Sequence, residues 1–245
     1  VYKRQAMNTA IILAGGIGSR VGGDIPKQFL TIKDVPIIAY TLEHFQRCAD
    51  IDSIVVVCLK GWENEIEKCR NDFGIDKIIR VISGGKNSFE SISAGVLGIS
   101  DIMDPKGIVV IHDSVRPIIS SEMISDCIDV AKIHGNGCAS IPMNETIVKK
   151  KSKISGSENI DRSSVMRVQT PQAYRYDLIS NLYSKAHEKG ISDSIYANTL
   201  FLEFGGEIFF SKGSETNLKV TSRKDLDIIE ILINKGSVHP KKKES

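Results

Sequence analysis

Short apolar runs alternate with longer amphipathic stretches along most of the chain. The short runs are rich in Val and Ile, which is typical of strands that are buried on both faces. We predict such strands at Thr9–Leu13, Ser53–Leu59, Lys77–Ile82, Gly107–Ile111 and Gly137–Ile141. The longer stretches place apolar residues at helical spacing, which predicts helices at Ile37–Gln46, Glu63–Asp72, Phe89–Ile99 and Glu122–His134.

This alternation of strands and helices predicts an α/β fold, namely a Rossmann-like, mostly parallel sheet with helices on both faces. Ligands of such sheets bind beyond the carboxyl ends of the strands, at a point where the strand order reverses. We therefore expect the chemistry directly after Leu13, Ile82 and Ile111.

The alternation breaks between about Pro142 and Val168, where the chain is polar and rich in Lys and Ser. Two short β-like pieces lie near Thr146–Lys149 and Ser164–Val168. A disordered loop is one interpretation, but we favour a small β-arm over about 142–168 that projects from the sheet. Beyond this segment the pattern predicts helices at Asp177–Glu188, Ser192–Phe204 and Ser222–Lys235, and a strand at Glu207–Ser211.

The whole pattern fits one domain over residues 7–236. Residues 1–6 precede a methionine and are interpreted as a non-native or disordered start. Residues 237–245 are rich in lysine, and we interpret them as a disordered, solubilising tail rather than as a nucleic-acid-binding segment.

Composition narrows the class of partner. The 245 residues include 32 basic and 30 acidic ones, which leaves a net charge of +2. A broad nucleic-acid surface would need excess basic charge, so we expect no nucleic-acid partner. No apolar run approaches the roughly 20 residues that a membrane span needs, and we expect no membrane partner. The five cysteines form no C-x-x-C pair, which favours free thiols in a reducing, cytoplasmic setting.

The first predicted strand leads into a glycine-rich segment, Leu13–Arg20, which is followed by Pro26–Gln28. Glycines here let backbone N–H groups approach phosphate oxygens closely. The segment is not a dinucleotide fingerprint, because Val21 stands where Gly or Ala is required. It is not a P-loop either, because a proline precedes Lys27. What it offers is two cations, Arg20 and Lys27, beside a glycine-lined turn.

Together with four later segments, this string resembles the family of 2-C-methyl-D-erythritol 4-phosphate and ribitol-5-phosphate cytidylyltransferases. The later segments are Gly84-Gly85 with Ser91, His112–Pro117, Gln169–Gln172 and Asn217–Thr221. They stand in the family's order, and the resemblance spans roughly Thr9 to Asn234. It implies CTP-dependent transfer of CMP to a polyol phosphate with release of pyrophosphate.

The resemblance implies a role for each matching residue. The cations that assist the transfer would be Arg20, Lys27 and Lys219. The nucleotide would be contacted by Ala14, Gly15, Gly16, Gly18, Gly85, Ser91 and Ser114. The acceptor would be bound by Asp113, Arg116, Thr146, Arg162, Thr170 and Ser192. In the family, the arginine matched by Arg162 reaches into a partner subunit, which implies a homodimer.

Asp113 and His112 follow the fourth predicted strand, at the edge where ligands are expected. A carboxylate is a hard oxygen ligand, so we expect Asp113 to hold Mg²⁺ as a cofactor. The alternative for Asp113 is a turn-forming role. An acceptor phosphate is already an anion and needs no general base, so we expect a structural role for His112.

The chain departs from the family pattern at some positions. Ser88 stands where the family usually has an arginine, and Lys86 is the candidate for supplying that charge. Glu145 replaces the usual aspartate. The details at Gly15-Gly16, Val115 and Ser192-Asp193 favour ribitol 5-phosphate as the acceptor.

Three alternatives to ribitol-phosphate transfer stay open at this point. The first is 2-C-methyl-D-erythritol 4-phosphate as the acceptor. The others are a nucleotidyltransferase specific for another base, which would share the first motif only, and a non-catalytic nucleotide-binding protein, for which the missing arginine is the support.

Overall fold

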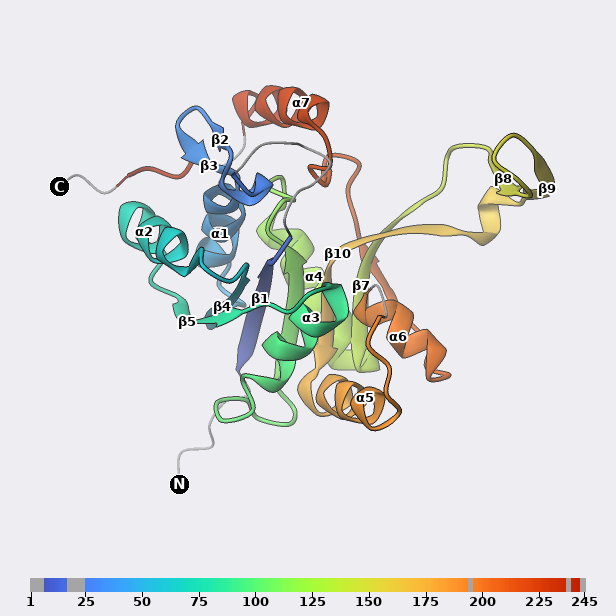
Figure 1. Cartoon of the computed structure of the whole chain (residues 1–245), viewed down its shortest axis with the longest axis horizontal. Coiled ribbons are helices and arrows are strands. Elements are labelled where there is room, and N and C mark those ends of the chain that lie inside the picture. The colour runs from blue at the N-terminus through green and yellow to red at the C-terminus, as the bar shows by residue number, and fades with distance from the viewer. Residues whose placement is uncertain (1–6, 17–24, 194–195, 237–238, 243–245) are drawn as a thin grey trace.

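The computed structural model describes residues 7–16, 25–193, 196–236 and 239–242. Its centre is a seven-stranded sheet (Figure 1). In spatial order the strands are β11 (Phe210–Lys212), β7 (Asn136–Pro142), β10 (Met166–Arg175), β6 (Ile108–Asp113), β1 (Asn8–Ala14), β4 (Ser53–Cys58) and β5 (Ile78–Ser83). All neighbours are parallel except β10, which runs antiparallel to both β6 and β7. The Rossmann-like, mostly parallel α/β fold is therefore confirmed.

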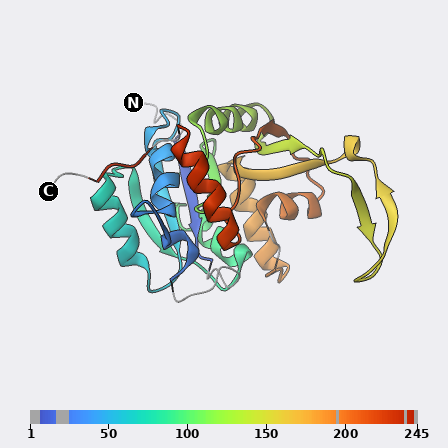
Figure 2. The same ribbon diagram turned by 90° about the horizontal axis from the view of Figure 1, so that it is seen from above.

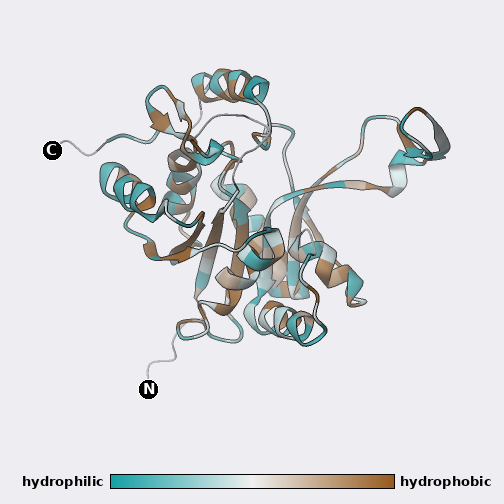
Figure 3. Cartoon of the chain, viewed as in Figure 1, coloured by the Kyte–Doolittle hydropathy of each residue, from teal (hydrophilic) through white to brown (hydrophobic). Residues whose placement is uncertain are grey.

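Helices cover both faces of this sheet. One face packs against α1 (Ile37–Arg47), α2 (Glu63–Phe73) and α4 (Ser121–His134). The other face packs against α3 (Ser88–Leu97), α5 (Tyr176–Glu188) and α6 (Ala197–Glu203). Successive side chains of a strand point to opposite faces, so Ile11 joins one core and Ile12 the other, and both are fully buried. Figure 3 shows the same division, with apolar strands inside and polar helix surfaces outside.

The last helix, α7 (Arg223–Asn234), forms a smaller core of its own. Ile229 and Ile233 pack there with Tyr40 of α1 and with Val220. The helix begins at Ser222, which forms a reciprocal capping box with Asp225. Such a box satisfies backbone donors at the helix start. This packing matters for the site, because it fixes the chain just after residue 219.

Only the start of β10 was expected, as the β-like piece near Ser164–Val168, although β10 lies between two other strands in the sheet. Its residues 169–174 are all buried, and three of them are Gln169, Thr170 and Gln172. A polar run that contains Pro171 lacks the apolar pattern from which a strand is predicted. The register shift between Val168 and Gln172 marks the irregular point.

The small β-arm is present, and its hairpin consists of β8 (Ile147–Lys150) and β9 (Gly156–Ile160). It projects away from the sheet in two perpendicular views (Figures 1 and 2). The β-like piece near Ser164–Val168 is the start of β10 in the main sheet and not the second strand of the arm. Residues 162–164 form a 3-10 turn, and β10 already begins at Met166, paired with β7. We call residues 143–165 the arm.

Three further details differ from expectation. The helix predicted from Ser192 begins only at Ala197, because Tyr196 still has extended backbone (φ −144°, ψ 161°). A short hairpin, β2 (Thr31–Ile32) and β3 (Val35–Pro36), was not predicted. Residues 239–242, expected to be disordered, include a buried Pro240.

Of the helices in the described part of the chain, none has the length and apolar character that crossing a bilayer requires.

Candidate active site

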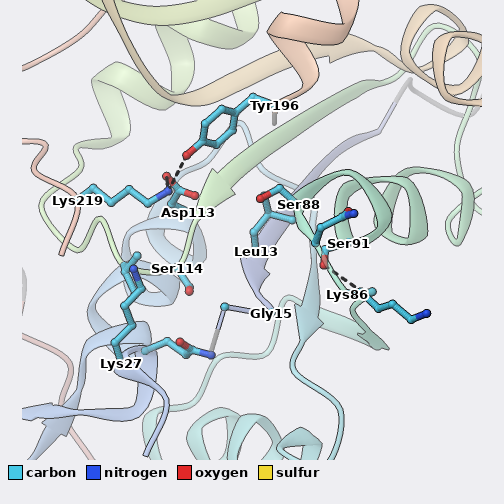
Figure 4. A pocket seen from close by; sticks show the side chains of 15 residues that line it. Leu13, Gly15, Lys27, Lys86, Ser88, Ser91, Asp113, Ser114, Tyr196 and Lys219 are labelled. Carbon is cyan, nitrogen blue, oxygen red and sulfur yellow. Dashed lines mark hydrogen bonds and ion pairs between the residues drawn. The ribbon is translucent and has the colours of Figure 1, made fainter. Parts of the chain in front are cut away.

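A cavity of about 210 Å³ lies beyond the carboxyl ends of β1, β5 and β6 (Figure 4). This is the edge that the strand order predicts for a ligand. Segments far apart in the sequence line it: Leu13, Gly15, Gly16, Lys27, Gln28, Gly85, Lys86, Asn87, Ser88, Ser91, Asp113, Ser114, Val115, Tyr196 and Lys219. In Figure 4, Lys27 and Lys219 lie on one side of the cavity, and Ser88 and Ser91 on the other.

The glycines on the Ser91 side are required by close approach. A Cβ at Gly15 would lie 3.2 Å from Ser91 Oγ, and a Cβ at Gly85 would lie only 2.1 Å from the Cβ of Glu90. Without those side chains, the backbone N–H of Gly85 donates to Ser91 Oγ at 3.1 Å. Ser91 therefore lies against both glycine segments, and backbone groups together with small polar side chains form this wall of the cavity.

The N-terminus of α3 adjoins the same wall. Asn87 caps the helix by accepting a hydrogen bond from Glu90 N at 2.9 Å. The amide of the same Asn87 donates to Ser192 O at 2.8 Å. Lys86 was expected to replace the family's arginine charge, but in Figure 4 its ammonium group points away from the cavity. The structure therefore does not support Lys86 as the substitute for that arginine.

Asp113 is the centre of the charged wall. Its Oδ2 lies 3.0 Å from Lys219 Nζ and 3.1 Å from Arg116 Nε. Burial alone would raise the pKa of Asp113, but the charges of Lys219 and Arg116 outweigh it and hold the pKa below its ordinary value. Asp113 is therefore an ionised carboxylate that balances two cations.

Three separate motifs meet behind this carboxylate. The backbone N–H of Asp113 donates to Thr170 Oγ1 at 3.1 Å. Asn217 donates to Thr170 O at 2.7 Å, and its own carbonyl accepts from Arg116 at 2.8 Å. Asn217 and Thr170 are both buried. These bonds lock the strand end, the bulge of β10 and the segment that carries Lys219 into one unit.

The segment after the first strand is tied to the same region. Lys27 Nζ donates to the backbone carbonyl of Val220 at 2.9 Å, which attaches Lys27 to the residue that follows Lys219. The buried Gln28 donates to Ala14 O at 2.7 Å and so closes the turn after β1. Thr41 of α1 holds Ser114 O at 2.8 Å. Two lysines, one carboxylate and a glycine-lined wall thus face one cavity.

Comparison with known proteins identifies the family to which this architecture belongs. A family model described as 2-C-methyl-D-erythritol 4-phosphate cytidylyltransferase matches residues 8–235, almost the whole chain. The chain belongs to this family.

Individual relatives support the same assignment. A ribitol-5-phosphate cytidylyltransferase from Lacticaseibacillus paracasei is 42% identical over 226 residues, covering 91% of this chain and 97% of the relative. A 2-C-methyl-D-erythritol 4-phosphate cytidylyltransferase from Clostridium novyi is 34% identical over 237 residues, covering 94% and 97%. The chain is a cytidylyltransferase.

A solved structure has the same fold. The crystal structure of a 4-diphosphocytidyl-2C-methyl-D-erythritol synthase superposes with a TM-score of 0.78. The match covers 94% of this chain and 99% of that one, at 21% sequence identity. At that identity the likeness supports the fold alone.

The cavity of the cytidylyltransferase gathers half of the sixteen residues predicted from its motifs. It is lined by eight of them: Gly15, Gly16, Lys27, Gly85, Ser91, Asp113, Ser114 and Lys219. Gly18 and Arg20 lie outside the described residues. Ala14 is fully buried, and its carbonyl is already bound by Gln28. Arg116 and Thr170 lie behind Asp113 and hold it rather than line the cavity.

The remaining acceptor residues do not line the cavity. Thr146 and Arg162 are exposed on the arm, where Arg162 donates to Asn144 O at 3.0 Å. Ser192 is exposed as well, and its carbonyl accepts the bond from Asn87. Within this one chain, Thr146, Arg162 and Ser192 are therefore not assembled with Asp113.

The structure also adds residues that the motifs did not assign. Leu13, Gln28, Asn87, Val115 and Tyr196 all line the cavity. Gln28 follows Lys27 directly, so its place in the motif could have indicated it. Tyr196 gave no signal, because its contact with Lys219 spans 23 residues of sequence.

His112 is fully buried next to Asp113. Burial lowers the pKa of His112 to about 3, so the ring is neutral at ordinary pH. Its Nε2 lies 3.2 Å from Arg116 O, and its ring packs against Phe45 at 5.1 Å between centroids. These contacts fit the structural role expected for His112.

The described residues contain no group of three or more His, Cys, Asp or Glu side chains arranged to hold a metal. Among the described residues that line the cavity, Asp113 carries the one carboxylate. Mg²⁺ is commonly held by one or two carboxylates together with substrate phosphates. The chemistry of this wall therefore fits a metal that arrives with a nucleotide.

Proposed function

We propose that this cytidylyltransferase transfers CMP from CTP to ribitol 5-phosphate and releases pyrophosphate. The observation that carries the choice of acceptor is the 42% identity to a ribitol-5-phosphate cytidylyltransferase over nearly both full lengths. The cavity supports the transfer, because it combines a backbone-lined wall with Lys27, Lys219 and an ionised Asp113.

The reaction needs positioning and charge neutralisation more than proton transfer. An oxygen of the acceptor phosphate attacks the α-phosphorus of CTP, and the bond from that phosphorus to the pyrophosphate oxygen breaks. Negative charge grows on the leaving pyrophosphate. Lys27 and Lys219 are the described cations of the cavity that face this charge on the side opposite Ser91 (Figure 4).

We propose Mg²⁺ as the cofactor, held by Asp113 together with the phosphates of CTP. The side chains of Arg116 and Lys219 both contact Oδ2 of Asp113. A divalent ion would neutralise triphosphate charge and orient the α-phosphate.

A homodimer is the assembly we propose, with the arm reaching the cavity of a second copy. Thr146 and Arg162 are exposed, as are Val148 and Ile154, which are 53% and 97% exposed. An isolated two-stranded arm is marginally stable in water and gains from being covered. We also propose a cytoplasmic location, since all five cysteines are buried free thiols.

The second candidate acceptor is 2-C-methyl-D-erythritol 4-phosphate. The family model and the relative from Clostridium novyi favour it. Both acceptors are short phosphorylated polyols, so the shape of the pocket must distinguish them. Differences of this size are commonly worth about 10- to 200-fold in kcat/KM.

One assay separates these candidates. The enzyme is incubated with Mg²⁺, one nucleoside triphosphate and one acceptor, and pyrophosphate release is followed while the product mass is recorded. We expect kcat/KM with CTP and ribitol 5-phosphate to exceed that with CTP and methylerythritol phosphate by at least about tenfold. The reverse order of kcat/KM would show that methylerythritol phosphate is the acceptor in place of ribitol 5-phosphate. Comparable turnover with GTP, ATP or UTP, or none with any pair, would overturn cytidylyl transfer for this chain.

A further inference from the structure

Lys219, a lysine of the charged wall, is held from two sides. Its Nζ lies 3.0 Å from Asp113 Oδ2 and donates a hydrogen bond of 2.9 Å to the hydroxyl of Tyr196. The ammonium also lies 5.3 Å from the centroid of the Tyr196 ring. Figure 4 shows the phenol and the carboxylate converging on this nitrogen at the cavity wall.

These contacts constrain a group that is otherwise adaptable. A lysine ammonium is a point charge on a flexible four-carbon stem, with three donors that rotate together. A contact with Asp113 alone would leave rotation about that contact. A second fixed acceptor removes this freedom, and the tetrahedral geometry of the nitrogen then determines the direction of the third N–H.

Tyr196 can serve as a fixed acceptor because its backbone is anchored at the start of α6. Its carbonyl accepts from Leu200 N at 3.1 Å, and Ala197 and Leu200 are buried in the core beside α5. On the upstream side, Ser192 O accepts from Asn87, which also caps α3, the helix that carries Ser91.

We propose that Tyr196 is a positioning residue that directs the ammonium of Lys219 toward the phosphates during CMP transfer. This inference rests on the proposed function. Tyr196 acts through Lys219, and its hydroxyl is needed more than its ring.

The first test is Tyr196→Phe, which keeps the ring and removes the hydroxyl. We expect kcat to fall about tenfold, the loss of roughly one hydrogen bond to a charged group, while the KM for CTP changes less than about twofold. Tyr183→Phe is the matched control, because the buried Tyr183 hydroxyl has no hydrogen-bond partner in the described part of the chain. Equal kcat for wild type and Tyr196→Phe would overturn the proposal.

The second experiment asks whether Tyr196 acts through Lys219. In a Lys219→Met background, Tyr196→Phe should cause no further loss of kcat, because the group it positions is gone. A second, independent tenfold loss would show that Tyr196 acts on the substrate directly and would overturn the positioning role.

The third experiment needs no turnover, so its outcome can be distinguished from a failure of the proposed function. Trace labelling of lysines with acetic anhydride, quantified by mass spectrometry, reports how strongly each ammonium is engaged. Lys77, which donates to Cys48 O far from the cavity, is the internal reference. We expect labelling of Lys219 relative to Lys77 to rise several-fold in Tyr196→Phe and to stay constant in Tyr183→Phe. An unchanged ratio in Tyr196→Phe would overturn the proposal even if no acceptor is turned over.

Discussion

The sequence assigns Asp113 and Arg162 to the same acceptor, but the structure places them in contrasting surroundings. Asp113 is 6% exposed at the end of a buried strand, and two cations contact it. Arg162 is exposed on the arm, and its guanidinium donates to the nearby backbone carbonyl of Asn144. Asp113 is held through its carboxylate by Arg116 and Lys219 and through its backbone by Thr170, whereas the side chain of Arg162 has a partner from its own arm.

This contrast separates what one chain builds from what it leaves open. The charged wall needs no second molecule, because Arg116, Asn217 and Thr170 already hold it in place. The arm carries its predicted acceptor residues away from that wall (Figure 2). We therefore expect mutations in the wall to affect both folding and chemistry, and mutations in the arm to affect acceptor use alone.

The largest effect is expected at the wall, from Asp113→Asn. Removing the charge leaves Lys219 and Arg116 facing each other without a carboxylate and removes the proposed metal ligand. We expect kcat to fall by at least about 10²-fold and the free energy of unfolding to fall by about 1–3 kcal/mol. Steady-state kinetics and urea unfolding measure the two quantities. Turnover near that of wild type would rule out both roles.

A smaller effect on kcat is expected from Lys27→Ala. The ammonium faces charge that grows as pyrophosphate leaves, so its loss should lower kcat by about 10- to 100-fold and change the KM for CTP much less. Stopped-time assays at varied CTP concentration measure both parameters. If the KM for CTP rises while kcat stays constant, Lys27 contributes uniform binding and the assignment is wrong.

The smallest effect is expected from a change on the arm, Arg162→Ala. The KM for the acceptor should rise about tenfold or more, as the loss of a charge-assisted contact implies. The free energy of unfolding should change by less than about 0.5 kcal/mol, because the side chain is exposed. Lys153→Ala, also on the exposed arm, is the matched control and should leave the acceptor KM unchanged. A loss of stability like that of Asp113→Asn would remove the contrast between the two regions.

The regular parts of the fold could be predicted because their signals are local. Strand β1 and helix α4 show their periodicity in consecutive residues, and the position of the cavity follows from the strand order. Strand β10 could not be predicted in this way. Its buried Gln169 and Thr170 accept hydrogen bonds from Asn217, which lies 48 and 47 residues away in the sequence. No local sequence pattern indicates these contacts.

The site shows the same limit. Motif residues such as Gly85, Ser91 and Asp113 do meet, since each follows a strand that ends at one edge of the sheet. Tyr196 was expected inside a helix, and its role appears only when Lys219 is placed beside it. Thr170 was expected to touch the acceptor, but it is buried behind Asp113 and holds its backbone. Such roles depend on tertiary contacts rather than on residue type.

Mixing an arm variant with a wall variant tests most directly the central claim, that a second copy's arm completes the acceptor site. Asp113→Asn and Arg162→Ala chains are mixed in equal amounts, subunit exchange is verified, and CMP transfer is assayed at an acceptor concentration well below KM, where both parents are impaired. Random pairing makes half of the dimers mixed, each with one complete site, so we expect about a quarter of wild-type activity. A mixture of Asp113→Asn and Lys219→Met is the control and should stay inactive, because both defects lie in the wall. Activity of the first mixture no higher than that of its parents, or a monomer by sedimentation at assay concentration, would contradict the claim.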